Sequence, residues 1–87
     1  MGKTLSERPP KPAAKRLTWA EQREWDGMEG AILEAERALD ACREAVDDRA
    51  IASDAAALQE RHAALEAARA EVDRLYARWA ELEAKQA

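Results

Sequence analysis

The chain has 87 residues, enough for one domain, and 37% of them are charged while only 5% are aromatic. Three glycines and three prolines are too few for a loop-rich or β-rich fold, and the abundance of Ala, Glu, Arg and Leu is typical of long helices or coiled coils. The single cysteine, Cys42, excludes an internal disulfide, and no apolar run is long enough to span a bilayer or to act as a signal peptide. We therefore expect a soluble, cytoplasmic protein that has no contact with a membrane.

The net charge of −4 is divided unevenly along the chain. Residues 1–16 carry five basic groups against one acidic group, a net of +4, whereas residues 17–87 carry nine basic and seventeen acidic groups, a net of −8. A basic segment joined to an acidic body indicates either a polyanionic partner for that segment or a solvated linker. Pro9, Pro10 and Pro12 disfavour helix, and no apolar periodicity accompanies them, so residues 1–16 are predicted to be a disordered linker.

A first helix is predicted over about 19–46. Thr18 and Glu21 form the pattern of a capping box, in which each side chain accepts a hydrogen bond from the backbone of the other residue. Apolar positions then step by three and four residues, which predicts a coiled-coil seam. The seam of this helix comprises Trp25, Met28, Ile32, Ala35, Leu39, Cys42 and Val46. Gly27 and Gly30 lie outside the seam and are expected to let the first turns fray.

A tip over 47–53 and a second helix over about 54–85 follow. Ser53 or Asp54 is expected to cap this helix, and Arg61 is the one charged residue of its seam, with a head that reaches water near the turn. The seam of the second helix comprises Leu58, Arg61, Leu65, Ala68, Val72, Leu75, Trp79 and Leu82.

The short turn between two long helices predicts an all-α fold, a monomeric two-helix antiparallel coiled-coil hairpin with a disordered basic N-terminal tail. Two registers fit the seams. Trp25 lies level with Leu75 in the first, which the shorter loop favours, and with Leu82 in the second.

The aromatic, cysteine and histidine side chains point to structure rather than to chemistry. Trp25 and Trp79 are expected in the core, whereas Trp19 and Tyr76 are better placed for an exposed contact. Cys42 reads as a small core residue, and one cysteine with one histidine does not make a metal site. The chain has no Gly-rich phosphate loop and no nucleophile with a base beside it, so we expect that it is not an enzyme.

Two end motifs carry a family resemblance. Residues 17–25, Leu-Thr-Trp-Ala-Glu-Gln-Arg-Glu-Trp, resemble the opening Leu-Ser/Thr-x-x-Glu-Gln-Arg-Glu-Leu of the C-terminal domain of Uup-type ABC-F ATP-binding cassette ATPases. Residues 75–83, Leu-Tyr-Ala-Arg-Trp-Ala-Glu-Leu-Glu, resemble that domain's closing Leu-Tyr-x-Arg-Trp-x-Glu-Leu-Glu. The tip departs from the family pattern, because Asp48 is followed by Arg49 instead of proline.

The resemblance implies an antiparallel coiled-coil hairpin with a short 3₁₀ segment at its tip, preceded in the parent protein by two ATP-binding cassettes. The cassettes would hold the ATP, so no cofactor is expected in this chain, which would be an excised domain or a truncated or stand-alone copy. The family's domain is associated with DNA, and ABC-F proteins act on the ribosome, so the implied partner is DNA or ribosomal RNA.

The basic residues that could serve such a partner lie in the tail and near the open end of the hairpin, and the acidic body opposes phosphate binding. A simpler reading makes Arg23 and Arg78 solvated helix charges that form pairs along their own helices, as Arg74 and Arg78 can with Glu71 and Glu81. The alternatives to a nucleic-acid-binding arm are a protein-interaction or spacer coiled coil, which would contact a ribosomal protein or orient the parent ATPase, and, fitting less well, a tRNA-contacting arm. The candidate residues are Lys11, Lys15, Arg16, Arg23, Arg78 and Lys85.

Overall fold

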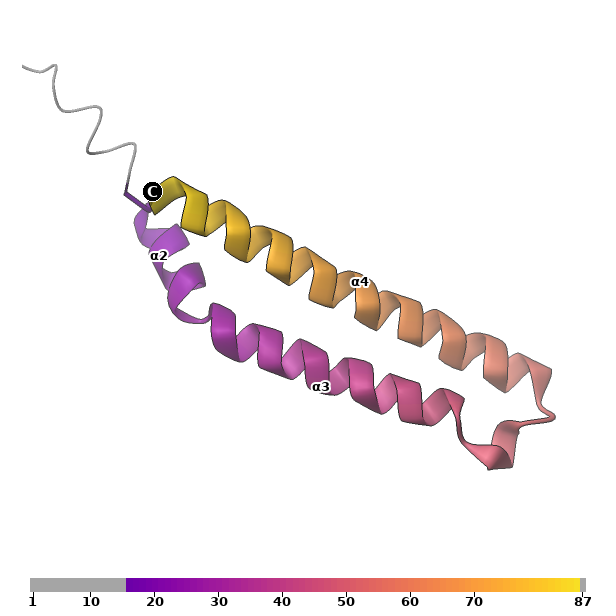
Figure 1. Ribbon diagram of the computed structural model, residues 1–87. Helices are drawn as coiled ribbons and strands as arrows, with labels where there is room; N and C mark the ends of the chain where they lie inside the picture. The colour runs from indigo at the N-terminus through magenta and orange to yellow at the C-terminus, as the bar shows by residue number, and fades with distance from the viewer. Residues whose placement is uncertain (1–15, 87) are drawn as a thin grey trace, which may run out of the picture.

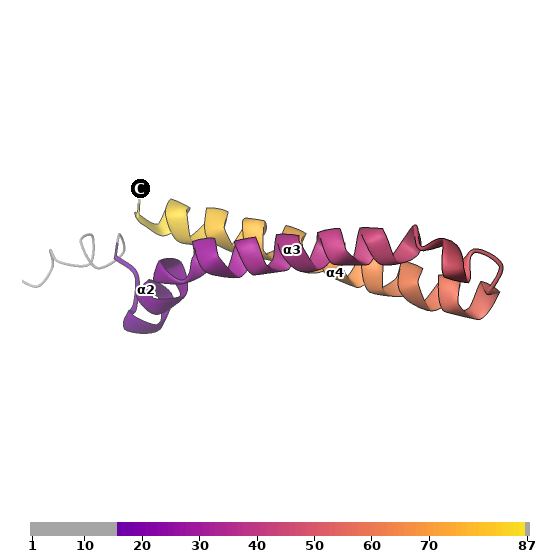
Figure 2. The ribbon, with the colours of Figure 1, turned by 90° about the horizontal axis from the view of Figure 1, so that it is seen from below.

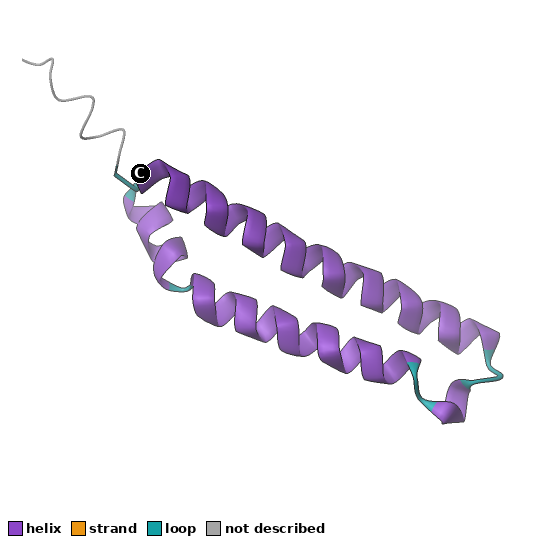
Figure 3. Cartoon of the chain, viewed as in Figure 1, coloured by secondary structure: helices purple, strands orange, loops and turns teal. Residues whose placement is uncertain are grey.

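The computed structural model describes residues 16–86, which contain helices and turns and no strand. The elements are α2 (Trp19–Asp26), α3 (Met28–Val46), the 3₁₀ helix η1 (Arg49–Ile51) and α4 (Ala55–Gln86) (Figures 1 and 3). The predicted all-α class is therefore confirmed for this part of the chain. The tail predicted over 1–16 lies outside the described residues, except for Arg16.

Helix α2 begins at the predicted capping box. The backbone N–H of Glu21 donates to Thr18 Oγ1 at 3.1 Å, and the backbone N–H of Thr18 donates to Glu21 Oε1 at 2.9 Å. Two of the N–H groups that a helix start leaves without partners are thereby satisfied.

The single first helix predicted over 19–46 is wrong in one respect, because the chain leaves helical geometry at Gly27. This residue has φ −95° and ψ 1°, and α2 turns away from the axis of α3 there (Figure 2). Glycine has no Cβ and loses more conformational freedom in a helix than other residues, so a helix breaks most readily at this type of residue. Gly30, by contrast, lies inside α3.

The tip is built from short-range hydrogen bonds. Asp48 accepts from the backbone N–H of Ala50 at 2.9 Å and so caps η1. Asp54 accepts from the backbone N–H of Ala57 at 3.0 Å and is the residue that caps α4, one of the two predicted. The 3₁₀ segment implied by the family resemblance is therefore present, although no proline precedes it.

Helices α3 and α4 run antiparallel beside each other (Figure 1). The two predicted seams face inward, as the burial of their side chains shows. None of the fifteen seam residues is fully exposed, but burial is graded along the pair. The deepest cluster lies near the open end, where α2 begins and α4 ends, and comprises Met28, Ile32, Leu75 and Leu82. Toward the tip the seam residues are less buried, and Leu58 and Leu65 are only half-buried.

Contacts at both ends select the second register. Lys85 pairs with Glu21 near the open end, and Arg61 donates to the backbone oxygen of Ala45 near the tip. The first register would set each α4 residue of these pairs about two helical turns from its partner. The preference for the first register is therefore wrong, because η1 lengthens the connection between the helices beyond a minimal turn.

Candidate functional site

The open end gathers most of the predicted site residues that the structure describes. Arg16 precedes α2 and Arg23 lies within it, and Arg78 and Lys85 lie on the last turns of α4. Lys11 and Lys15 lie outside the described residues. The environments of the four described cations differ sharply.

Arg78 is held by carboxylates of both helices. Its guanidinium makes a bidentate pair with Glu24, with Nε–Oε2 at 2.8 Å and Nη2–Oε1 at 2.9 Å, and Nη1 donates to Glu81 at 2.9 Å. The hydrogen bond from Arg78 lowers the pKa of the Glu24 carboxyl, and the bonds to Glu24 and Glu81 raise the pKa of Arg78. The side chain of Arg78 is 29% exposed, so this cation presents little of its charge to a partner.

Lys85 is paired as well. Its Nζ lies 2.5 Å from Oε2 of Glu21, the residue that also completes the capping box. The hydrogen bond from Lys85, followed by that from the backbone of Thr18, lowers the pKa of Glu21 to about 2. Glu21 therefore ties the start of α2 to the end of α4, which are 64 residues apart in sequence.

Arg23 has a different neighbour. Its guanidinium carbon lies 4.9 Å from the ring centroid of Trp19, a cation–π distance, and the Trp19 side chain is 75% exposed. Arg16 is also exposed and lines a shallow depression together with Thr18, Trp19 and Gln86. Neither Arg16 nor Arg23 forms an ion pair with any other described residue.

The pairing that was the simpler reading is confirmed along α4, where Arg74 binds Glu71 and Arg78 binds Glu81. It is wrong for Arg23, which pairs with no described carboxylate. Sequence reasoning missed the stronger bond of Arg78 to Glu24 across the helix pair. The signal was present, because both residues lie in the two end motifs that the family resemblance uses. The structure brings both motifs to the open end of the helix pair.

Arg61 does more than reach water. Its Nη1 donates to the backbone oxygen of Ala45 at 2.8 Å and to Asp48 Oδ2 at 3.2 Å, so it satisfies a carbonyl at the end of α3 and fixes the start of η1. This bond lowers the pKa of Asp48, after the larger effect of the backbone N–H of Ala50. The side chain thus has a structural role at the tip.

Packing explains Trp25, Trp79 and Cys42, whereas Tyr76 is 44% exposed, as predicted. Trp25 and Trp79 are half-buried against the core cluster. The Tyr76 hydroxyl donates to Glu36 at 2.7 Å, which raises the pKa of Tyr76. Cys42 is half-buried in the seam, and within residues 16–86 no three metal-binding side chains of the His, Cys, Asp and Glu types converge.

The structure is an antiparallel helix pair whose open end is held by the ion pairs of Arg78 with Glu24 and of Lys85 with Glu21. A family model for the ABC transporter C-terminal domain matches residues 16–84, and the chain belongs to this family. No curated protein and no solved structure matches the chain. Among the described helices, none is both long enough and apolar enough to cross a membrane.

Proposed function

We propose that this chain is the non-catalytic C-terminal arm of a cytoplasmic ABC-F ATPase of the Uup type, and that its open end binds nucleic acid, either DNA or ribosomal RNA. Membership of the ABC transporter C-terminal domain family supports the parentage, and the two end motifs support the Uup type. ATP would be bound and hydrolysed by the cassettes of the parent. A left-handed coiled coil of the two helices is part of the same proposal, supported by the shielding of every seam position.

The exposed Trp19 with Arg23 beside it carries the nucleic-acid proposal. A nucleic acid needs cations for its phosphates and flat apolar surfaces for its bases. Trp19 offers a largely free indole, and Arg16 and Arg23 offer charges that no described carboxylate neutralises. Both features occur where the chain meets its basic segment 1–16.

The six candidate residues divide into two roles under this proposal. Lys11, Lys15, Arg16 and Arg23 contact phosphate. Arg78 and Lys85 hold α2 against α4 through Glu24 and Glu21, and so position Arg23 and Trp19. Four phosphate contacts correspond to a slope of about −3 to −4 in a plot of log affinity against log salt concentration.

A gel-shift titration at low salt, with linear and branched DNA and with an RNA hairpin, tests the proposal. Arg23→Gln should weaken binding several-fold and reduce the salt slope by about one. Arg37→Gln is the matched control, because Arg37 is an exposed arginine of α3, away from the open end, that forms no ion pair with another described residue. The absence of a shift up to about 100 µM protein, the weak end of non-specific binding, would contradict the proposal, as would equal effects of the two variants.

The second candidate is a protein-interaction or spacer arm. It is favoured by the net charge of −8 over residues 17–87, which repels phosphates and suits a basic protein. In that case DNA would fail to compete in a pulldown, and Arg49→Glu at the exposed tip would disturb binding more than Arg23→Gln. Sedimentation at two concentrations would establish whether the chain is a monomer, as we propose.

A further inference from the structure

A cavity of about 250 Å³ lies near the junction of α2 and α3. Its lining is contributed by Trp25 and Asp26 of α2, Glu29 of α3 and Trp79 of α4. The two indole rings have centroids 6.3 Å apart and are inclined at 56°, so they pack against each other and together supply the aromatic part of the lining. Tyr76 extends the aromatic surface, with its ring centroid 6.3 Å from that of Trp79.

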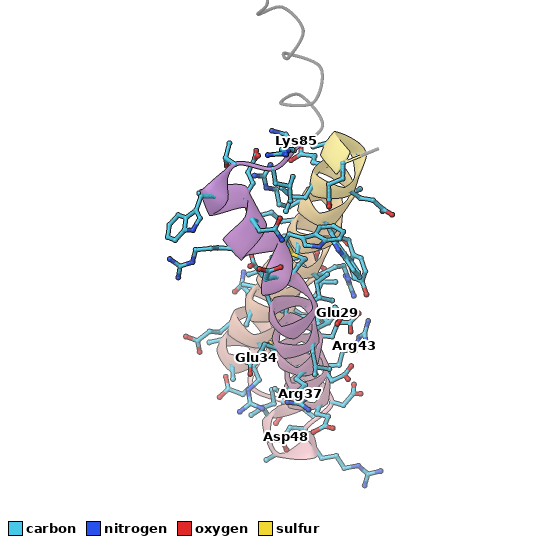
Figure 4. The ribbon with its side chains drawn as sticks, turned by 90° about the vertical axis from the view of Figure 1, so that its left-hand side faces the viewer. Glu29, Glu34, Arg37, Arg43, Asp48 and Lys85 are labelled. Carbon is cyan, nitrogen blue, oxygen red and sulfur yellow. The ribbon has the colours of Figure 1, made fainter. Side chains whose placement is uncertain are left out.

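The two carboxylates at this cavity are not neutralised by the described part of the chain. Asp26 accepts a hydrogen bond from Gln22 Nε2 at 2.9 Å, which carries no charge, and neither Asp26 nor Glu29 has a described cation within 4 Å. Their neighbours Glu21 and Glu24, by contrast, are paired with Lys85 and Arg78. Figure 4 shows Glu29 projecting from one side of α3 and Glu34 from the other.

Indole faces next to unpaired carboxylates are suited to one class of ligand. The negative face of an indole attracts ammonium and guanidinium groups, most strongly among the aromatic side chains, and the carboxylates supply charge-assisted hydrogen bonds to the same groups. A phosphate would meet repulsion from both carboxylates. The lining therefore selects a cation with a flat or compact head.

We infer that the cavity formed by Trp25, Asp26, Glu29 and Trp79 binds an arginine or lysine side chain presented by a partner protein. The charge of the lining and the aromatic walls both favour this occupant over a nucleic acid. The inference does not depend on nucleic-acid binding at the open end, because Trp19, Arg16 and Arg23 are not part of this cavity.

Tryptophan fluorescence tests the inference directly. In the full chain carrying Trp19→Phe, the two remaining tryptophans are both at the cavity. The probe is a tetra-arginine peptide with blocked ends, and a saturable change in emission is expected. Glu29→Gln should lower the affinity about tenfold, the typical cost of losing a hydrogen bond to a charged group.

Glu34→Gln is the matched control, with the same change of charge on the same helix but on the opposite side. It should leave the affinity for the peptide within about twofold of the parent, since distant surface charges are screened by salt. Equal losses in the Glu29 and Glu34 variants would overturn the inference, because they would show only a general attraction of the peptide to an acidic body. Circular dichroism verifies that both variants keep their helix content.

Two other occupants are separated by further arms of the experiment. In one arm, glutamine replaces the four basic residues Lys3, Arg8, Lys11 and Lys15. If this replacement changes the tryptophan emission and the peptide then causes no further change, the cavity is occupied by the chain's own N-terminal segment, and the inference is overturned. A DNA oligonucleotide that displaces the peptide and gives the same emission change would also overturn it. If DNA leaves the tryptophan emission of the Trp19→Phe chain unchanged, the inference is supported.

Discussion

Replacing Leu82 by alanine measures how much of the fold depends on the cluster at the open end. Leu82 is 0% exposed and lies with Met28, Ile32 and Leu75, against Trp25 and Trp79. Such a substitution in a core costs about 2 to 5 kcal/mol, and we expect about 3 kcal/mol because an elongated helix pair can close partly around the gap.

That loss is large for a molecule of this size. At about 0.05 to 0.15 kcal/mol per residue, the described residues 16–86 have a total free energy of unfolding of about 4 to 10 kcal/mol. With a urea dependence of about 1 kcal/mol per molar, the unfolding midpoint should fall by about 3 M. Urea titration followed by circular dichroism at 222 nm is the measurement.

Leu33→Ala is the matched control, because it makes the same change of residue within α3 at a side chain that is 49% exposed. It should cost less than about 0.5 kcal/mol, as surface substitutions usually do. If both variants lowered the midpoint equally, the burial at the open end would not be the source of stability, and the reasoning from the cluster would be refuted.

Three further outcomes are expected. Gly30→Ala should raise the free energy of unfolding by up to about 1 kcal/mol, because a Cβ there meets no atom within 4 Å and α3 is helical at this position; a lower urea midpoint would contradict this. The pKa of Glu21 is lowered from 4.5 to about 2, so its pairing stabilises the fold fully above pH 4.5 and this contribution is lost as the pH falls toward 2; NMR titration of the Glu21 carboxyl in Lys85→Gln should show a higher pKa, and an unchanged one would refute the pairing. Arg61→Ala should speed amide hydrogen exchange at Ala50 and leave exchange in α2 unchanged, and equal effects at both ends would show general rather than local loosening.

Hydrophobic periodicity was sufficient to predict which residues face inward. The apolar residues of each seam recur at steps of three and four residues and so form one stripe along the helix. A helix with a single apolar stripe buries it by facing that stripe toward its partner helix. The cap at Thr18 was equally predictable, because its two hydrogen bonds join residues three apart. Local signals of this kind need no knowledge of the partner helix.

The register was not predictable from the same pattern. Two alignments one heptad apart bury the same seam residues, so the apolar pattern alone cannot separate them. The difference is decided by the length that η1 adds at the tip and by the pair of Glu21 with Lys85. This pair joins residues 64 positions apart, and no local pattern connects them.

The pairs of Arg78 with Glu24 and of Lys85 with Glu21 explain why a prediction from the sequence overestimates the cationic surface of the open end. Counting basic residues near the ends treats Arg78 and Lys85 as equal to Arg23, but the fold assigns their charges to carboxylates across the helix pair. A charge that is already bound to two carboxylates gains little from a phosphate, since binding it would leave those carboxylates unpaired. Arg23 instead rests on an exposed indole, which leaves its hydrogen-bond donors available. The open end therefore separates cations that hold the helices together from cations that pair with no described carboxylate.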